Sequence, residues 1–119
     1  QTVHDEPGGG RTFEYSRQPG GQTCTMITLG PDGVMTALHQ VLAPAYFSQV
    51  QAGMSREQLR RLLGRPAKVW EFPLKREIVW DWRWNDGGQN KVFSATFDWE
   101  GRLLHAGSGP DPRDTEGGG

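Results

Sequence analysis

The features that usually assign a function directly are scarce in this chain. A single cysteine, Cys24, excludes an internal disulfide framework. The net charge of −1 excludes a uniformly basic nucleic-acid-binding surface, although a local basic patch is compatible with it. No apolar run approaches the roughly 20 residues that a membrane-spanning helix needs. The three histidines have no cysteine or carboxylate at metal-ligand spacing within one element, so no metal site is expected.

What the chain does contain is an internal repeat with a spacing of about 67 residues. Thr12–Tyr15 corresponds to Val79–Trp82, and the turn Gly30–Gly33 corresponds to Asp98–Gly101. Glycine-rich turns also lie at equivalent places between these segments. The segment Pro44–Pro66 occurs only once. The sequence therefore predicts one complete supersecondary unit, preceded by the strand half of another.

Short alternating runs predict three main antiparallel strands in each copy, connected as a meander. The expected strands are Arg11–Arg17, Thr23–Leu29 and Val34–Val41 in the first copy, and Arg76–Trp84, Lys91–Phe97 and Arg102–Ala106 in the second. Two further runs, Thr2–His4 and Lys68–Phe72, are compatible with short edge strands.

The unrepeated segment predicts a helical hairpin. Pro44 suits the first turn of a short helix that carries aromatic residues. Ser55 and Gln58 have the spacing of a capping box at the start of a second helix. Gly64 suits the left-handed end of that helix, and its apolar face consists of Leu59, Leu62 and Leu63. The fold class expected is α+β, with this hairpin packed on antiparallel three-stranded meanders.

The hairpin segment Gln51–Leu59, together with Leu62–Pro66, resembles the helix signature of the SmpA/OmlA (BamE-like) family of outer-membrane lipoproteins. The aromatic strand Val79–Trp84 and the segment Ala95–Leu103 match the strands that follow in that family. The resemblance covers roughly residues 46–106 and implies two short helices packed on a three-stranded antiparallel sheet.

The resemblance also implies a function and a location. It implies a non-catalytic module for protein–protein interaction in outer-membrane protein assembly or envelope integrity. The expected partners are envelope proteins, including barrel-assembly components, and anionic phospholipid. The implied location is the periplasm, at the inner leaflet of the outer membrane, through an N-terminal lipid anchor absent from this fragment. Cys24 does not replace the missing lipobox, because it lies inside an expected strand.

The chain departs from a one-unit member of this family, and Gln1 indicates a processed or engineered fragment of a two-unit protein. We divide it into the strand half of a first unit (1–43), a complete unit (44–107) and a disordered tail (108–119). The first unit lacks helices of its own, so its apolar face, with Phe13, Tyr15 and Met26, needs cover. A homodimer formed by swapping or edge pairing would provide it.

We expect no enzymatic activity and no cofactor. Cys24 alternates with apolar neighbours and has no histidine nearby, which favours a buried structural thiol over a nucleophile. Glu77 and Asp81 share one strand face between arginines and are interpreted as a paired, solvated surface. A hydrolase that uses His39 or His105, near the ends of corresponding strands, is the weakest alternative.

Two features indicate binding. Trp80, Trp82 and Trp84 point to one side of a single strand and are expected to form the core, with Trp84 or Trp99 as an exposed anchor. Seven of the thirteen basic residues lie between positions 56 and 76 and predict a solvated face for anionic lipid or an acidic partner. The expected contact residues are Arg56, Arg60, Arg61, Arg65, Lys68, Trp84 and Trp99.

Two expectations follow from that assignment. Reversing the charge of Arg60 and Arg61 should change stability little, because exposed charges contribute weakly. Nucleic acid is not an expected partner, since the aromatic stripes belong to the core. The alternative function is a secreted or periplasmic enzyme inhibitor, because tandem helix-plus-sheet units also occur in β-lactamase-inhibitory proteins. A solvent-facing aromatic sheet would favour the inhibitor, and buried tryptophans would favour the envelope module.

Overall fold

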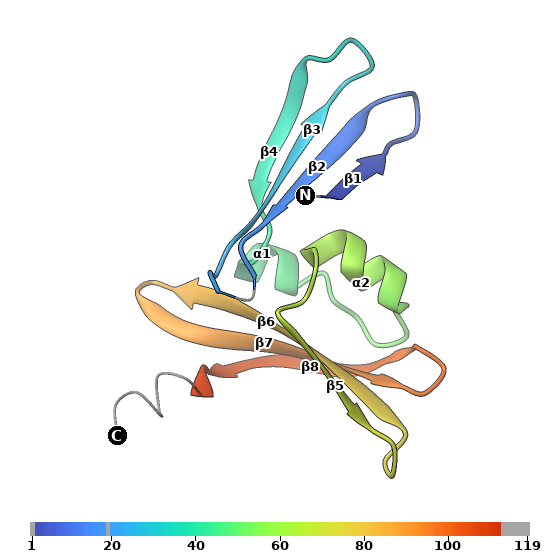
Figure 1. Ribbon diagram of the computed structural model, residues 1–119, viewed down its shortest axis with the longest axis vertical. Helices are drawn as coiled ribbons and strands as arrows, with labels where there is room; N and C mark the ends of the chain where they lie inside the picture. The colour runs from blue at the N-terminus through green and yellow to red at the C-terminus, as the bar shows by residue number, and fades with distance from the viewer. Residues whose placement is uncertain (1, 19, 113–119) are drawn as a thin grey trace.

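The computed structural model describes residues 2–18 and 20–112, and these form two four-stranded antiparallel sheets with two helices between them (Figure 1). The first sheet contains β1 (Thr2–Asp5), β2 (Arg11–Ser16), β3 (Cys24–Leu29) and β4 (Met35–Gln40). The second contains β5 (Lys68–Phe72), β6 (Glu77–Asp86), β7 (Gln89–Asp98) and β8 (Leu103–Pro110). The helices are α1 (Pro44–Phe47) and α2 (Arg56–Leu63).

The two sheets are structural copies of each other. Strands are paired in chain order in both, and in each an apolar cross-strand row crosses all four strands. The rows are Val3, Phe13, Ile27 and Leu38 in the first sheet, and Val69, Trp80, Ala95 and Ala106 in the second. An irregularity in register also falls at the same place, between Thr28 and Leu29 and between Thr96 and Phe97. The repeat in the sequence is therefore a repeat in the structure.

The strand count of each sheet and the end of β8 differ from the expectation. Each sheet has four strands, because β1 and β5 pair along β2 and β6 at the sheet edge. The expected disordered tail is also wrong for its first residues, since β8 continues to Pro110 and Asp111 is buried. The cause is the pairing of β8 with β7. This pairing begins where Phe97 lies opposite Leu103 and continues until Lys91 lies opposite Pro110. Residues 113–119 lie outside the described part of the chain.

The helical hairpin forms as its local signals predict. The Ser55 hydroxyl accepts a hydrogen bond from the Gln58 backbone N–H at 3.1 Å, and the Gln58 side chain accepts one from the Ser55 N–H at 2.8 Å. Gly64 ends α2 with a φ of +84°, a conformation that favours glycine. Pro44 occupies the first turn of α1. No helix in the described residues is long and apolar enough to cross a membrane.

The core lies mainly between the helices and the second sheet. Trp82, Phe97 and Leu59 are fully buried there. The ring of Phe47 from α1 stacks on Phe93 with 4.2 Å between centroids. The first sheet contributes fewer buried apolar side chains, and they belong to the face that meets the helices: Cys24, Met26 and, just after β4, Val41. The helices are thus a layer between two sheets, and the first sheet projects from the rest of the molecule (Figure 1).

Candidate interaction surfaces

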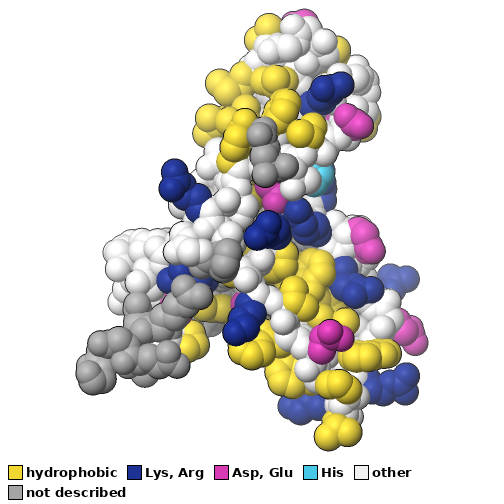
Figure 2. Space-filling model, viewed as in Figure 1, with side chains coloured by type: hydrophobic (Ala, Val, Ile, Leu, Met, Phe, Trp, Pro, Cys, Tyr) yellow, Lys and Arg dark blue, Asp and Glu magenta, His cyan; other side chains and the backbone are white. Residues whose placement is uncertain are grey.

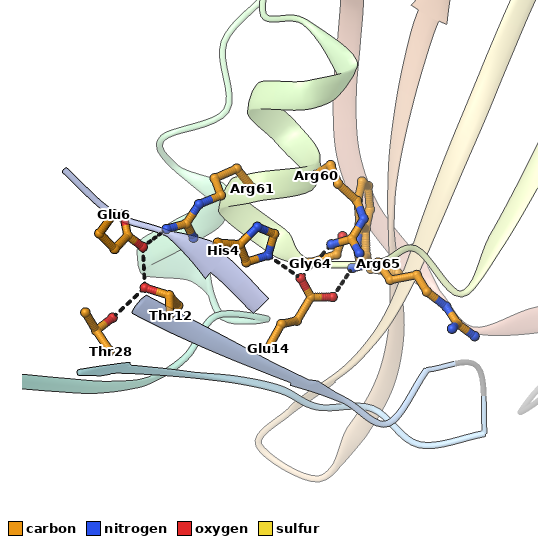
Figure 3. Close-up of polar contacts among 10 residues, drawn as sticks. His4, Glu6, Thr12, Glu14, Thr28, Arg60, Arg61, Gly64 and Arg65 are labelled. Atoms are coloured by element: carbon orange, nitrogen blue, oxygen red, sulfur yellow. Dashed lines mark hydrogen bonds and ion pairs between the residues drawn. The ribbon is translucent and has the colours of Figure 1, made fainter. Parts of the chain in front are cut away.

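The basic side of α2 faces the first sheet. Glu14 on β2 is 2% exposed, and its carboxylate accepts a hydrogen bond from Arg60 Nη1 at 2.6 Å (Figure 3). The ring of His4 lies 3.1 Å from the same carboxylate, and the backbone N–H of Arg65 donates to it at 2.9 Å. Burial raises the pKa of Glu14, but these hydrogen bonds outweigh it, so the pKa lies below its usual value.

A second carboxylate receives the next arginine of the helix. Glu6 forms an ion pair with Arg61 and accepts a hydrogen bond from the hydroxyl of Thr12. Thr12 also lies 3.0 Å from the hydroxyl of Thr28 on the neighbouring strand. The hydrogen bond from Thr12 is the largest influence on the pKa of Glu6 and lowers it. Burial raises this pKa, but the charge and hydrogen bond of Arg61 lower it further, so it lies below its usual value. Figure 3 shows both carboxylates reaching toward α2.

These contacts correct one expectation. Arg60 and Arg61 do not form a freely solvated surface, because each is paired with a carboxylate of the first sheet. Charge reversal would place two carboxylates against each other at both positions. The ion pairs contradict the premise of that expectation, and we now expect charge reversal to lower stability. The sequence could not show this, since Glu6 and Glu14 are about 50 residues away and only the tertiary fold brings them to the helix.

The end of α2 also brings the two sheets together. A Cβ on Gly64 would lie 2.5 Å from the sulfur of Cys24, so only glycine fits there. The carbonyl oxygen of Gly64 accepts a hydrogen bond from the indole N–H of Trp82 at 3.0 Å. Burial and the neighbouring Glu14 raise the pKa of Cys24 to about 12. The thiol is fully buried and stays protonated at neutral pH, which confirms the expected buried thiol.

The β2–β3 loop docks on the edge of β6. The carboxamide of Gln18 donates to the backbone oxygen of Arg83 at 2.7 Å and accepts from its backbone N–H at 2.9 Å. It thereby takes the place of a paired strand beyond Asp81, which pairs with the first residue of β5. The guanidinium of Arg83 donates to the carbonyl of Gly20 and to the buried Asp111, both at 3.0 Å. No sequence pattern marks a side chain that substitutes for a strand.

The remaining expected contact residues divide between interior and surface. Trp84 is only 4% exposed, lies against Phe47 and donates to the hydroxyl of Ser108 at 3.0 Å. Its assignment as an exposed anchor is wrong, because α1 covers it. Trp99 is 42% exposed, as expected of an anchor. Arg65 is also exposed.

The other two basic residues lie against other groups. The guanidinium of Arg56 lies close to Gly101, at the β7–β8 turn. The ammonium of Lys68 sits 4.1 Å above the ring of Trp70. The contact roles of Arg56, Arg65, Lys68 and Trp99 stay predictions.

The residues considered for chemistry do not form a site. His39 lies on β4 of the first sheet and His105 on β8 of the second. The carboxylate of Asp81 accepts hydrogen bonds from Trp70 and Ser94 at 2.8 and 2.6 Å. Among the described residues, no group of three or more histidine, cysteine or acidic side chains could hold a metal ion.

The structure reveals an apolar surface that the sequence did not single out. At one end of the second sheet, the β5–β6 turn exposes Leu74 completely, between the half-exposed Phe72 and the basic residues Lys75 and Arg76. Trp99 lies beside this turn and lines a surface pocket that it shares with the basic residues of the turn and with the acidic residues Glu77, Asp98 and Glu100. We call residues 72–76 together with Trp99 the hairpin tip. Figure 2 shows apolar and basic side chains intermingled around this end of the molecule.

A second exposed apolar surface lies on the first sheet, on the side away from the helices. We call it the bare face; it consists of Val3, Phe13, Tyr15, Ile27, Leu29, Met35 and Leu38. The expectation of an apolar face with Phe13 and Tyr15 is confirmed, but Met26 was wrongly included. It alternates to the opposite face and is buried there. Hydrophobic side chains gather over the first sheet in Figure 2.

Comparisons with known proteins add little. No family model and no curated protein matches the chain. Among solved structures, the chain is similar to one named provisionally as the osmotically inducible lipoprotein OsmE, determined by X-ray crystallography. The identity is 24% and the TM-score 0.47, over 61% of this chain and 76% of that one. A similarity at this level assigns neither a function nor a partner to the chain.

Proposed function

We propose that the chain is a non-catalytic interaction module of the cell envelope. In this proposal it acts at the periplasmic face of the outer membrane, in outer-membrane protein assembly or envelope integrity, and it binds protein partners and anionic phospholipid. The observation that carries the proposal is the exposure of two apolar surfaces, the bare face and the hairpin tip, on so small a chain. Exposed apolar areas of this kind mark interaction sites. The family resemblance of residues 46–106 supports the proposed location.

The hairpin tip supports the lipid part of the proposal. Tryptophan is enriched at membrane interfaces, and basic residues near an anionic surface contribute about 1 kcal/mol each. Leu74 is fully exposed beside Lys75 and Arg76, and Trp99 lies next to them. This arrangement suits a tip that places apolar side chains among head groups while its cations contact phosphates.

The lipid role is tested with vesicles that contain phosphatidylglycerol. We expect Lys75→Glu/Arg76→Glu to weaken vesicle binding severalfold, and more strongly at low salt, where screening is least. Arg17→Glu is the matched control, because this exposed arginine belongs to the first unit. Equal binding by the tip variant and the wild type at low ionic strength would remove lipid from the proposal.

The protein role is tested by affinity capture from an outer-membrane fraction with the tagged chain. Recovery of barrel-assembly components above the level captured by an unrelated tagged protein supports the proposal. Recovery of one soluble enzyme instead would contradict it and would support the enzyme inhibitor.

One observation favours that second candidate. The bare face carries solvent-accessible aromatic side chains, Phe13 and Tyr15, on an antiparallel sheet. On the second sheet, however, Trp82 and Trp84 are buried and Trp80 packs against the core. The burial of these tryptophans favours the envelope module.

A further inference from the structure

The bare face has an exact structural counterpart, and that counterpart is covered. Because the two sheets share their register, each residue of the bare face can be matched to one on the second sheet. Tyr15 corresponds to Trp82, Leu29 to Phe97 and Met35 to Leu103. The three residues of the second sheet are at most 3% exposed beneath α1 and α2, whereas Tyr15 and Met35 are 45% and 56% exposed.

The apolar character of this surface is kept in both copies. The seven residues of the bare face are matched by the apolar residues Val69, Trp80, Trp82, Ala95, Phe97, Leu103 and Ala106. Arg11 and Thr25 lie on the same side, where the second sheet has Ile78 and Phe93, so the first sheet is less apolar there. In an antiparallel sheet with one solvent-facing side, the residues on that side are ordinarily polar. The first sheet therefore carries the pattern of a helix-covered face, although no helix among the described residues covers it.

The point at which the hairpin is attached to the second sheet also has an equivalent position on the first sheet. In the loop between α1 and α2, the backbone N–H of Gly53 donates to the carbonyl oxygen of Leu103 at 2.7 Å. The backbone N–H of Leu103 in turn donates to the carbonyl oxygen of Met54 at 2.8 Å. The residue equivalent to Leu103 is Met35. Met35 and the preceding Val34 are 56% and 60% exposed. The point where a hairpin loop would attach is thus exposed and apolar.

We propose that the bare face is a docking surface for an amphipathic helical hairpin of a partner protein. The hairpin has the chemistry of Pro44–Gly64: a short aromatic helix, a tight loop, and a second helix with a leucine stripe. Docking continues the alternation of helix and sheet layers already present in the fold. This inference rests on the proposed function and names the class of partner that the module binds.

A second copy of this chain does not supply the hairpin. Its α2 is already enclosed on both sides, since Leu59 and Leu63 are buried in the core and Arg60 is paired with Glu14. Releasing the hairpin would expose Trp82 and leave a buried carboxylate without its cation. A second copy is therefore not the expected source of the docked helices.

The probe is a synthetic peptide of residues 44–66. Within the chain, this segment packs on the face of the second sheet that is equivalent to the bare face. We expect it to bind the full chain in a calorimetric titration and to perturb amide signals of β1–β4. Leu38→Glu, at the exposed edge of the bare face, should weaken this binding at least about tenfold, which corresponds to 1.4 kcal/mol. The matched control is Leu74→Glu, the same change at a fully exposed leucine of the hairpin tip, and should leave binding unchanged.

Fusing the hairpin segment to the chain allows docking to be detected even when the free peptide binds weakly. Residues 44–66 placed directly before residue 1 reproduce the length of the connection between α2 and β5, and tethering raises the effective concentration to about millimolar. We expect slower hydrogen exchange in β1–β4, abolished by Leu38→Glu. No slowing, or peptide binding that ignores Leu38→Glu, would overturn the inference. So would a wild-type dimer that Leu38→Glu dissociates, because the occupant would then be a second copy.

The outcomes separate this inference from the proposed function. If Leu38→Glu still captures barrel-assembly components and the peptide does not bind, the docking surface is wrong and the module stands. If the peptide binds as expected but no envelope protein is captured, the docking surface stands and the assignment to the envelope is wrong.

Discussion

The two sheets have the same strand order, register and bulge, but α2 holds them by different chemistry. Toward the second sheet the helix presents Leu59 and Leu63, which are fully buried in the core that contains Trp82 and Phe97. Toward the first sheet it presents Arg60 and Arg61, which meet the carboxylates of Glu14 and Glu6, beside a smaller apolar contribution from Cys24 and Met26. An amphipathic helix usually gives its charged side to water. Here that side is an internal joint, because the opposing sheet supplies matching carboxylates.

The two kinds of contact respond differently to conditions. Apolar burial is proportional to area and does not depend on protonation. Hydrogen-bonded ion pairs depend on the charge of each partner. The second sheet should therefore be the stable part of the molecule, and the attachment of the first sheet the part that yields first. The following predictions test this difference.

The largest effect is expected at two equivalent positions, one of which is covered by the helical hairpin in the second sheet while the other is exposed in the first sheet. Leu103→Ala should lower the free energy of unfolding by about 2–5 kcal/mol, because the side chain is 3% exposed beneath the hairpin. Met35→Ala, at the equivalent position of the first sheet, should change it by about 0.5 kcal/mol or less. Chemical denaturation measures both. Equal losses would show that the bare face is covered in solution.

The next effect concerns the polar joint. Arg60→Glu removes the cation from the buried carboxylate of Glu14 and adds a like charge. Breaking a fully buried pair costs about 3–5 kcal/mol; since Arg60 is 27% exposed, we expect about 2–3 kcal/mol. Arg65→Glu is the control: this exposed side chain should contribute less than about 1 kcal/mol. Hydrogen exchange should localise the loss in Arg60→Glu to β1–β4, and a loss spread over β5–β8 would argue against a separate joint.

Acid should weaken the same joint. The pKa values of Glu14 and Glu6 in the folded protein lie below their usual 4.5. A depressed pKa adds stability above pH 4.5, and that stability is lost as the pH falls through the folded-state values. All five tryptophans belong to the second sheet or its turns, so their fluorescence reports on that sheet. Below pH 4.5, the protection of the β1–β4 amides, measured relative to the intrinsic exchange rate at each pH, should fall before the fluorescence changes; simultaneous changes would contradict the prediction.

The smallest effect acts on the shared helix. Ser55→Ala removes the hydroxyl that caps α2 and should cost about 0.5–2 kcal/mol. Since both sheets depend on α2, opening of β1–β4 and β5–β8 should become easier by similar amounts. Ser48→Ala, on an exposed serine just after α1, serves as the control. A loss confined to one sheet would mean that α2 does not link them.

The parts of this fold that the sequence predicts are those with local signals. The capping box at Ser55, the left-handed Gly64 and the glycine-rich turns each depend on neighbours within a few residues, and each forms as expected. The internal repeat predicts two similar sheets. The edge strands β1 and β5 were less evident, since their partners lie across turns and Pro73 interrupts the pattern.

The candidate site was less predictable, because its contacts cross between distant segments. Arg60 looks solvated within its own helix and becomes internal only when Glu14 reaches it from β2. Trp84 looks like an exposed strand end until α1 covers it. Trp99 kept its expected exposure because a hairpin turn places it outside any layer. The sequence thus indicated which side chains are notable, and the tertiary contacts decided which of them face a partner.

The most direct test of the different attachment of the two sheets is native-state hydrogen exchange of the full chain at neutral pH, followed amide by amide with increasing denaturant. It compares equivalent residues on β2–β3 and β6–β7. The account predicts that the β6–β7 amides exchange only through global unfolding, while the β2–β3 amides exchange through an opening of lower free energy that Arg60→Glu lowers further. A single free energy of opening shared by both sheets, and shifted equally by Arg60→Glu, would contradict it.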